Sequence, residues 1–369
     1  MAINIGIVGL PNVGKSTLFN ALSAAGAEAA NFPFCTIEPN VGVVPVPDER
    51  LSKLSVLYKS EKLVPTSLEF VDIAGLVKGA SKGEGLGNQF LSHIRQVDAI
   101  AHVVRCFDDS NIVHVDGSID PIRDVQTINT ELALADLATV EKRIERTNKL
   151  VKSGGKQGDE ARAEMARLEA LQKHLNTGAA ARGLAIDDDG KKLIRELFLL
   201  TGKPIIYVAN LAEGTVTKPE TVPYFQKLTE LAKAEGAPVI PISAAIEAEV
   251  SQLPDADRAD YLASMGLTEP GLHKIIREGY RVLGLITYLT AGPQETRAWT
   301  IREGTKAPGA AGVIHTDFER GFIKAEVMRW EDLVELKTEA AVKSAGKMRV
   351  EGKEYVVRDG DVMHFRFNV

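Results

Sequence analysis

A glycine-rich segment near the start of the chain has every fixed residue of a phosphate-binding loop. Residues 9–16 match G-x-x-x-x-G-K-[ST], with an apolar run before them at 3–8 and helical spacing after them at 17–22. The glycines let backbone N–H groups turn toward a polyphosphate, the lysine reaches the β and γ phosphates, and the serine hydroxyl can ligate Mg²⁺. We therefore predict a nucleoside triphosphate site with contacts from Asn12, Val13, Gly14, Lys15, Ser16 and Thr17.

A second motif, D-x-x-G at residues 72–75, lies at the end of a predicted apolar strand further along the chain. In a switch NTPase this aspartate acts at the Mg²⁺ ion and the glycine N–H approaches the γ phosphate, so Asp72 and Gly75 are assigned these roles. Thr36 is the candidate first-switch hydroxyl for Mg²⁺, with an ordinary loop threonine as the alternative. Glycines at 75, 79, 83, 85 and 87 would permit an order-to-disorder change on hydrolysis.

The base-reading motif departs from that of a GTPase. After the apolar run 205–209 the chain has N-L-A-E in place of N-K-x-D. Glu213 carries its carboxylate one methylene further out, and Leu211 removes the lysine stem that covers guanine. Asn210 can still donate to adenine N7 and accept from its 6-amino group. We predict ATP as ligand, with GTP tolerated, and backbone contacts to the base from Ser243 and Ala244, which could equally form a plain strand-to-helix turn.

The sequence predicts slow hydrolysis. Leu76 follows Gly75 where Ras-like enzymes have the glutamine that orients water, and leucine cannot do this. His114 is the nearest titratable candidate for a catalytic residue, with a solvated loop histidine as the alternative. Asn12 within the loop could ligate K⁺ beside the phosphates, where the ion would neutralise developing charge.

Length, charge and cysteine content limit the classes of protein to which the chain can belong. The chain has 369 residues, two cysteines and a net charge of -6. It shows no secretory leader and no apolar run of membrane-spanning length, so we expect a cytoplasmic protein without a membrane partner, acting as a monomer. Its length allows two or three domains.

The pattern of apolar segments predicts an α/β fold. Runs at 3–8, 41–46, 67–73, 99–106, 204–209 and 238–242 read as strands of a doubly wound P-loop domain. This domain is expected to span 1–128 and 201–282, interrupted at 129–200 by an antiparallel helical hairpin, or coiled coil, that turns at 153–158. A separate α+β domain is expected at 283–369, with strands at 299–301, 312–314, 355–357 and 362–367.

The predicted hairpin is locally basic. Between residues 141 and 182 ten lysines and arginines oppose six acids, which leaves about +4 in an acidic chain. This surface could meet RNA phosphates, with affinity falling as salt rises. Alternatively, it is a solvated face laced with i,i+4 ion pairs.

At this point the motifs resemble one family along the whole chain. Segments 9–16, 31–40, 72–80, 83–88 and 210–213 resemble the YchF-type Obg-like ATPases, and 358–369 resembles the end of a TGS domain, a β-grasp module. The resemblance implies ATP hydrolysis favoured over GTP, Leu76 as the family's replacement for glutamine, and His114 as a catalytic residue. It also implies association with ribosomes or ribosomal RNA and a role in translation regulation or stress response.

Two other functions stay open from the residues alone. One is a metabolic phosphotransferase that uses the helical insertion as a lid over its acceptor. The other is a nucleotide held for structure and never hydrolysed. The D-x-x-G motif and the glycines after it favour a nucleotide-gated switch over the phosphotransferase, because no acceptor site and no base near one can be named in the sequence.

Overall fold

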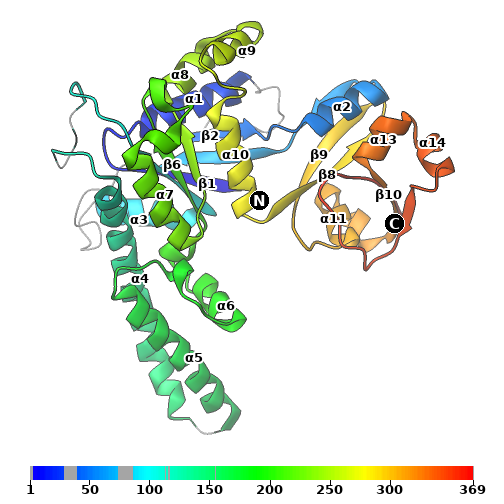
Figure 1. Cartoon of the computed structure of the whole chain (residues 1–369). Helices are drawn as coiled ribbons and strands as arrows, with labels where there is room; N and C mark the ends of the chain where they lie inside the picture. The colour runs from blue at the N-terminus through cyan, green and yellow to red at the C-terminus, as the bar shows by residue number, and fades with distance from the viewer. Residues whose placement is uncertain are drawn as a thin grey trace. The chain divides into compact units, whose positions relative to one another are not determined.

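The computed structural model describes residues 3–28, 40–73, 86–112, 114, 117–153 and 155–368 (Figure 1). These residues form two compact units. The first unit comprises the described residues of 3–25, 40–42 and 69–275, and the second comprises 26–28, 43–68 and 276–368. Each unit has its own six-stranded sheet.

The sheet of the first unit has the order β2-β4-β1-β5-β6-β7. Strands β4, β1, β5, β6 and β7 pair in parallel. Every residue of β5 and β6 is buried, as expected for strands that helices cover on both faces. The doubly wound α/β prediction is confirmed. The strands are β1 (Asn4–Val8), β2 (Val41–Pro45), β4 (Ser67–Asp72), β5 (Ala99–Arg105), β6 (Ile205–Asn210) and β7 (Val239–Ile242).

Helices connect these strands and carry the chain away from the sheet and back. The α-helices are α1 (Lys15–Glu28), α3 (Leu86–Gln96), α4 (Pro121–Val151), α5 (Gly155–Leu175), α6 (Asp188–Glu196), α7 (Pro223–Glu235), α8 (Ala244–Gln252), α9 (Asp255–Ser264) and α10 (Gly271–Val282). Short 3₁₀ segments are η2 (Ala181–Gly183), η3 (Leu200–Gly202), η4 (Glu213–Thr215) and η5 (Pro219–Thr221). Among the described residues, no helix is both long and apolar enough to cross a membrane.

The expected helical hairpin is formed by α4 and α5, which lie side by side in Figure 1. Asp120 caps α4 by accepting hydrogen bonds from the backbone N–H groups of Ile122 and Arg123. An apolar seam that includes Val140, Leu168 and Leu171 joins the two helices. The turn is shorter than predicted, because α5 already begins at Gly155.

The second unit is an α+β layer structure. Its sheet has the order β11-β10-β12-β8-β9-β3, with helices on both faces. Neighbouring residues of β12 point to opposite faces, so Met363 packs with α11 and Val362 packs with α2 and α13. The strands are β3 (Lys62–Val64), β8 (Leu285–Ala291), β9 (Glu295–Arg302), β10 (Phe322–Arg329), β11 (Arg349–Glu351) and β12 (Asp361–Phe367). The helices are α2 (Glu49–Tyr58), α11 (Ala307–Ile314), α12 (Thr316–Arg320), α13 (Trp330–Leu336) and α14 (Glu339–Ser344).

Two strands predicted in the C-terminal region are wrong. Residues 312–314 end helix α11, and residues 355–357 contribute only an isolated bridge between Val356 and Lys306. Short apolar runs fit either a strand or a buried helical turn, and tertiary packing decides between them. In the helix, Gly312 lies so close to Glu319 that an added Cβ would come within 2.4 Å of its carboxylate.

Residues 43–68 lie in the second unit, although their sequence pattern predicted that they belong to the nucleotide-binding domain. Strand β3 pairs with β9, and Leu51 and Leu54 of α2 are buried in the core that β8 and β12 share. This placement depends on partners more than 200 residues away in sequence, so local patterns carry no signal for it.

Candidate nucleotide-binding site

The phosphate-binding loop lies between the end of β1 and the start of α1. Asn12 and Gly14 adopt left-handed backbone conformations, with φ of 63° and 93°. A Cβ at Gly14 would lie 2.3 Å from Asn210 Nδ2 as well, so this position requires glycine for conformation and for space. Ser16 and Thr17, in the first turn of α1, are exposed. The loop therefore presents its amides and hydroxyls at a helix N-terminus, where phosphate is favoured.

Lys15 and Asp72 form an ion pair. Asp72 ends β4, which lies beside β1 in the sheet, and the two side chains are only 11% and 18% exposed. The fold thus brings together the phosphate lysine and the acid predicted for the Mg²⁺ region. Thr36, Gly75 and Leu76 lie outside the described residues.

Asn210 joins three segments of the site. Its Nδ2 donates to the Val13 carbonyl oxygen over 2.9 Å, and its Oδ1 accepts from the Ala244 N–H over 2.9 Å. The residue is 4% exposed. An asparagine amide has two N–H donors and two acceptor lone pairs. One donor and one lone pair remain with which Asn210 can read a base.

The other predicted base-reading residues differ in their surroundings. Glu213 is exposed at the start of η4. Leu211 is 1% exposed, so its side chain belongs to the core. Ser243 is buried, and the Ala244 N–H already donates to Asn210. In this structure the turn at 243–244 therefore braces Asn210.

His114 is buried and paired. Its Nε2 lies 2.9 Å from Asp124 Oδ2, in the first turn of α4, and the two side chains are 4% and 2% exposed. Burial raises the pKa of the Asp124 carboxyl, and the hydrogen bond with His114 opposes this rise. The structure thus makes His114 part of a buried histidine–carboxylate pair, in place of the solvated loop residue weighed from sequence.

Sequence reasoning missed Arg105. This side chain, 1% exposed at the end of β5, donates to the carbonyl oxygens of Phe107, Asp109 and Ile112. It holds the loop that leads to His114. An arginine at the end of a largely apolar strand was the available signal, because a buried guanidinium needs several acceptors.

The donor set fits a magnesium ion held mainly by nucleotide. Within the described parts of the chain, no three His, Cys, Asp or Glu side chains cluster to form a metal cage. Mg²⁺ at a phosphate site needs only one or two protein oxygens, with phosphates and water as its other ligands. Ser16 at the start of α1 and Asp72 at the end of β4 could supply them.

A phosphate loop at the carboxyl end of a parallel sheet, with its lysine facing a strand-end aspartate, defines a P-loop nucleotide-binding protein. Comparisons with known proteins agree. Residues 4–142 match a family model described as "50S ribosome-binding GTPase", and residues 285–368 match the YchF-GTPase_C model, described as "Protein of unknown function".

Relatives match over the full length. The chain is 56% identical to proteins named "Ribosome-binding ATPase YchF" from Haemophilus ducreyi and Bacillus subtilis, over 100% of each chain. It also resembles the solved structure of the Schizosaccharomyces pombe YchF GTPase, with a TM-score of 0.89 and 42% identity over 99% of this chain and 97% of that one. The chain belongs to the YchF family.

Proposed function

We propose that the chain is an ATPase that tolerates GTP and acts in the cytoplasm as a nucleotide-gated switch on the ribosome, regulating translation or stress response. The observation that carries this proposal is the meeting of Lys15 and Asp72 beside the phosphate loop. The bacterial relatives named as ribosome-binding ATPases support it.

Most of the phosphate site would come from residues that the structure describes. The amides of residues 12–17 would surround the β and γ phosphates, and Lys15 would exchange Asp72 for a phosphate oxygen. Ser16 and Asp72, with Thr36, would hold Mg²⁺, which when bound neutralises charge on the phosphate oxygens. Gly75 would sense the γ phosphate through its N–H.

Attack by water would proceed without a switch-two glutamine, since Leu76 cannot orient it. We propose His114 as the general base, which requires its imidazole to move away from Asp124 toward the nucleotide. Asn12 would bind K⁺ beside the phosphates. Turnover in KCl and in NaCl at equal ionic strength tests the ion, and equal rates would remove K⁺ from the mechanism.

Base choice would come from the free donor and acceptor of Asn210 together with the exposed Glu213. Their arrangement favours adenine because the carboxylate lies one carbon further out than the guanine-binding aspartate. The names of relatives differ on this point, with ATPase for the bacterial proteins and GTPase for the Schizosaccharomyces pombe structure. Equilibrium affinities for ATP and GTP, measured with Mg²⁺ and K⁺ on one preparation, provide the test. GTP bound a hundredfold more tightly would overturn the assignment.

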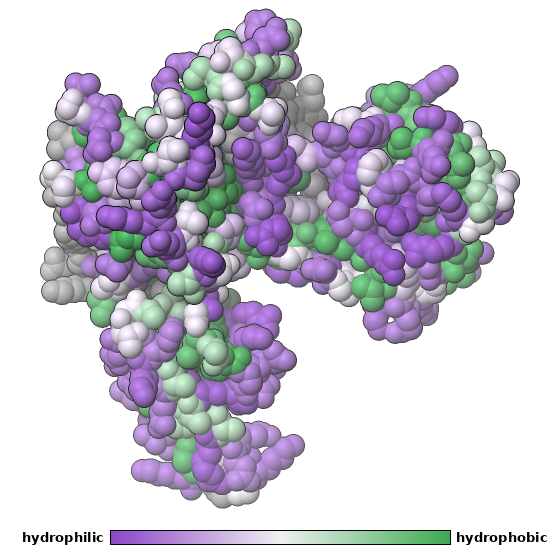
Figure 2. Space-filling view, viewed as in Figure 1, coloured by the Kyte–Doolittle hydropathy of each residue, from purple (hydrophilic) through white to green (hydrophobic). Residues whose placement is uncertain are grey.

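Ribosome binding is supported by the charge on the hairpin. Figure 2 shows a largely hydrophilic surface there. Several of its arginines are held in ion pairs, as Arg143 is with Glu164 and Arg167 with Asp187. A row of exposed basic residues follows helical spacing along α4 to its C-cap: Lys142, Arg146, Lys149 and Lys152. None of these four forms an ion pair with another described residue. We propose that this row contacts RNA phosphates.

Sedimentation with ribosomes tests both the binding and its gating. We expect more protein in the ribosome pellet with a non-hydrolysable ATP analogue than with ADP. Replacing the four basic residues of the row by alanine should reduce pelleting and flatten its salt dependence. A control variant replaces Lys191 and Lys192 of α6, which are exposed but paired with acids on their own helix. Equal pelleting of wild type and row variant would refute the RNA contact.

A further inference from the structure

Two neighbouring strands run from the phosphate site into the second unit. We call residues 40–46 and 66–72, which contain β2 and β4, the ribbon. At one end the Asp72 N–H donates to the Asn40 carbonyl oxygen over 2.9 Å, and at the other the Val46 N–H donates to the Thr66 carbonyl oxygen over 2.8 Å. The boundary between the units crosses both strands, between 42 and 43 and between 68 and 69.

The chain between the two strands is built into the second unit. Leu51 and Leu54 are 2% and 0% exposed within its core. Strand β3 extends its sheet by pairing with β9. The Ser60 hydroxyl donates to the Gly292 carbonyl oxygen over 2.7 Å. The far end of the ribbon is therefore held by apolar burial, strand pairing and side-chain hydrogen bonds.

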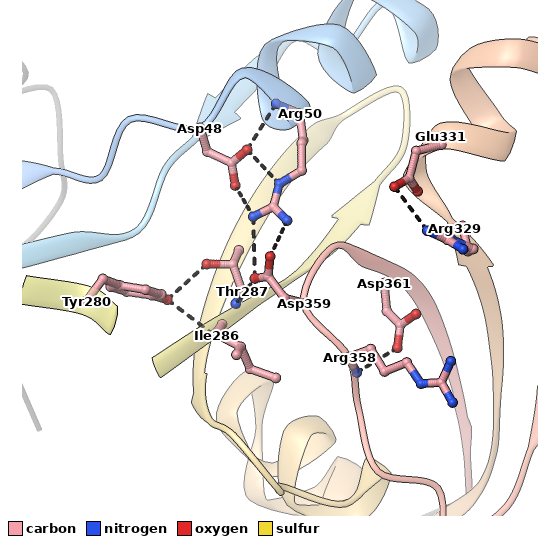
Figure 3. Close-up of polar contacts among 10 residues, drawn as sticks. All are labelled: Asp48, Arg50, Tyr280, Ile286, Thr287, Arg329, Glu331, Arg358, Asp359 and Asp361. Carbon is pink, nitrogen blue, oxygen red and sulfur yellow. Dashed lines mark hydrogen bonds and ion pairs between the residues drawn. The ribbon is translucent and has the colours of Figure 1, made fainter. Parts of the chain in front are cut away.

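A charged network holds the chain where it passes from β2 into α2. Arg50 donates to both carboxylate oxygens of Asp48, each over 2.8 Å, and to Asp359 over 2.6 Å (Figure 3). Asp359 also accepts from the Thr287 N–H over 2.8 Å. We call Asp48, Arg50 and Asp359 the Arg50 clamp. It ties residue 50 to the loop that precedes β12 and to β8.

Nucleotide binding would change the ion pairing at the near end of the ribbon. In this structure Asp72 pairs with Lys15. A bound triphosphate would take Lys15, and Asp72 would turn to the metal region. Because the Asp72 N–H is bonded to Asn40, a shift of Asp72 acts on both strands at once. Coupling between two sites requires an element that has two discrete arrangements and that both sites influence. The ribbon would be such an element.

We propose that the ribbon couples the phosphate site to the second unit, and that the Arg50 clamp transmits the change. This inference rests on the proposed nucleotide binding. Its consequence is that the local stability of the second unit differs between the nucleotide-bound and the empty states. Coupling is reciprocal, so a partner that binds the second unit would change nucleotide affinity by the same factor.

Hydrogen exchange of the full chain tests this. Amide exchange in residues 46–66 and 285–368 is compared without nucleotide, with ADP and with a non-hydrolysable ATP analogue, each at saturation confirmed by calorimetry. We expect exchange rates in the second unit to differ by about fivefold or more between the empty and triphosphate states, the lower end of typical coupling. The R50A variant should bind nucleotide with a Kd within about twofold of wild type yet lose this difference.

A second variant and a control separate transmission from general damage. D359N removes the charge opposite Arg50 and keeps an acceptor for Thr287, so it should lose the response even if R50A proves unfolded. R366A removes an exposed ion pair with Glu326 in the same sheet and should keep the response. Unchanged exchange in nucleotide-saturated wild type, or a full response in folded R50A and D359N, would overturn the proposal. Absence of nucleotide binding would instead overturn the proposed function.

Discussion

Replacing Asn210 by alanine tests how the site is held together. The change removes a donor from the Val13 carbonyl oxygen and an acceptor from the Ala244 N–H, both within the buried interior. A buried polar group that loses its partner costs about 1–3 kcal/mol. Two such groups give roughly 2–6 kcal/mol of lost stability, or a decrease in Tm of at least about 4 °C for a unit of this size.

Thermal denaturation and calorimetric titration with ATP provide the assay. We expect N210A to melt at lower temperature and to bind ATP at least tenfold more weakly, because the phosphate loop loses its brace and the base loses a contact. N176A, at an exposed position on the turn after α5, is the matched control and should change stability by less than about 0.5 kcal/mol. An N210A protein with the Tm and Kd of wild type would refute the bracing role.

Three further predictions concern ionisable groups. Burial, assisted by Arg182, lowers the pKa of His102 from 6.5 to about 3, so the folded state disfavours its protonation. The free energy of unfolding should therefore fall as the pH decreases from 6.5 to about 3, by up to about 1.4 kcal/mol per pH unit. Urea unfolding of H102L should lack this pH dependence. The hydrogen bond from Arg143 lowers the pKa of Glu164 below its ordinary value of 4.5. The ionised Glu164 therefore stabilises the folded state above pH 4.5, and this stabilisation is lost as the pH falls through the lowered pKa. E164Q should thus weaken hydrogen-exchange protection of the hairpin near neutrality by at most about 1 kcal/mol and match wild type in acid. H114A should lower kcat about a hundredfold with Kd for ATP unchanged, and an unaltered kcat would exclude His114 as base.

Much of the first unit could be predicted because its signals are local. The parallel strands are apolar runs that helices bury on both faces, and all six expected runs correspond to strands within one or two residues. The hairpin follows from helical spacing on either side of a glycine-rich turn. The C-terminal region was harder, since its apolar runs are short and the helix ending at Ile314 could not be told from a strand.

At the site, the sequence alone determined the phosphate loop, because its glycines, lysine and serine are required by chemistry within eight consecutive residues. It also indicated Asp72, since a strand followed by D-x-x-G is typical of a switch NTPase when a phosphate loop lies upstream of it. Only the tertiary structure decided that Asn210 donates a hydrogen bond to Val13, 197 residues away in sequence. The same holds for the hydrogen bond between His114 and Asp124. The tertiary structure likewise decided that residues 43–68 join the second unit. These contacts depend on burial and pairing between distant segments, for which a linear pattern carries no signal.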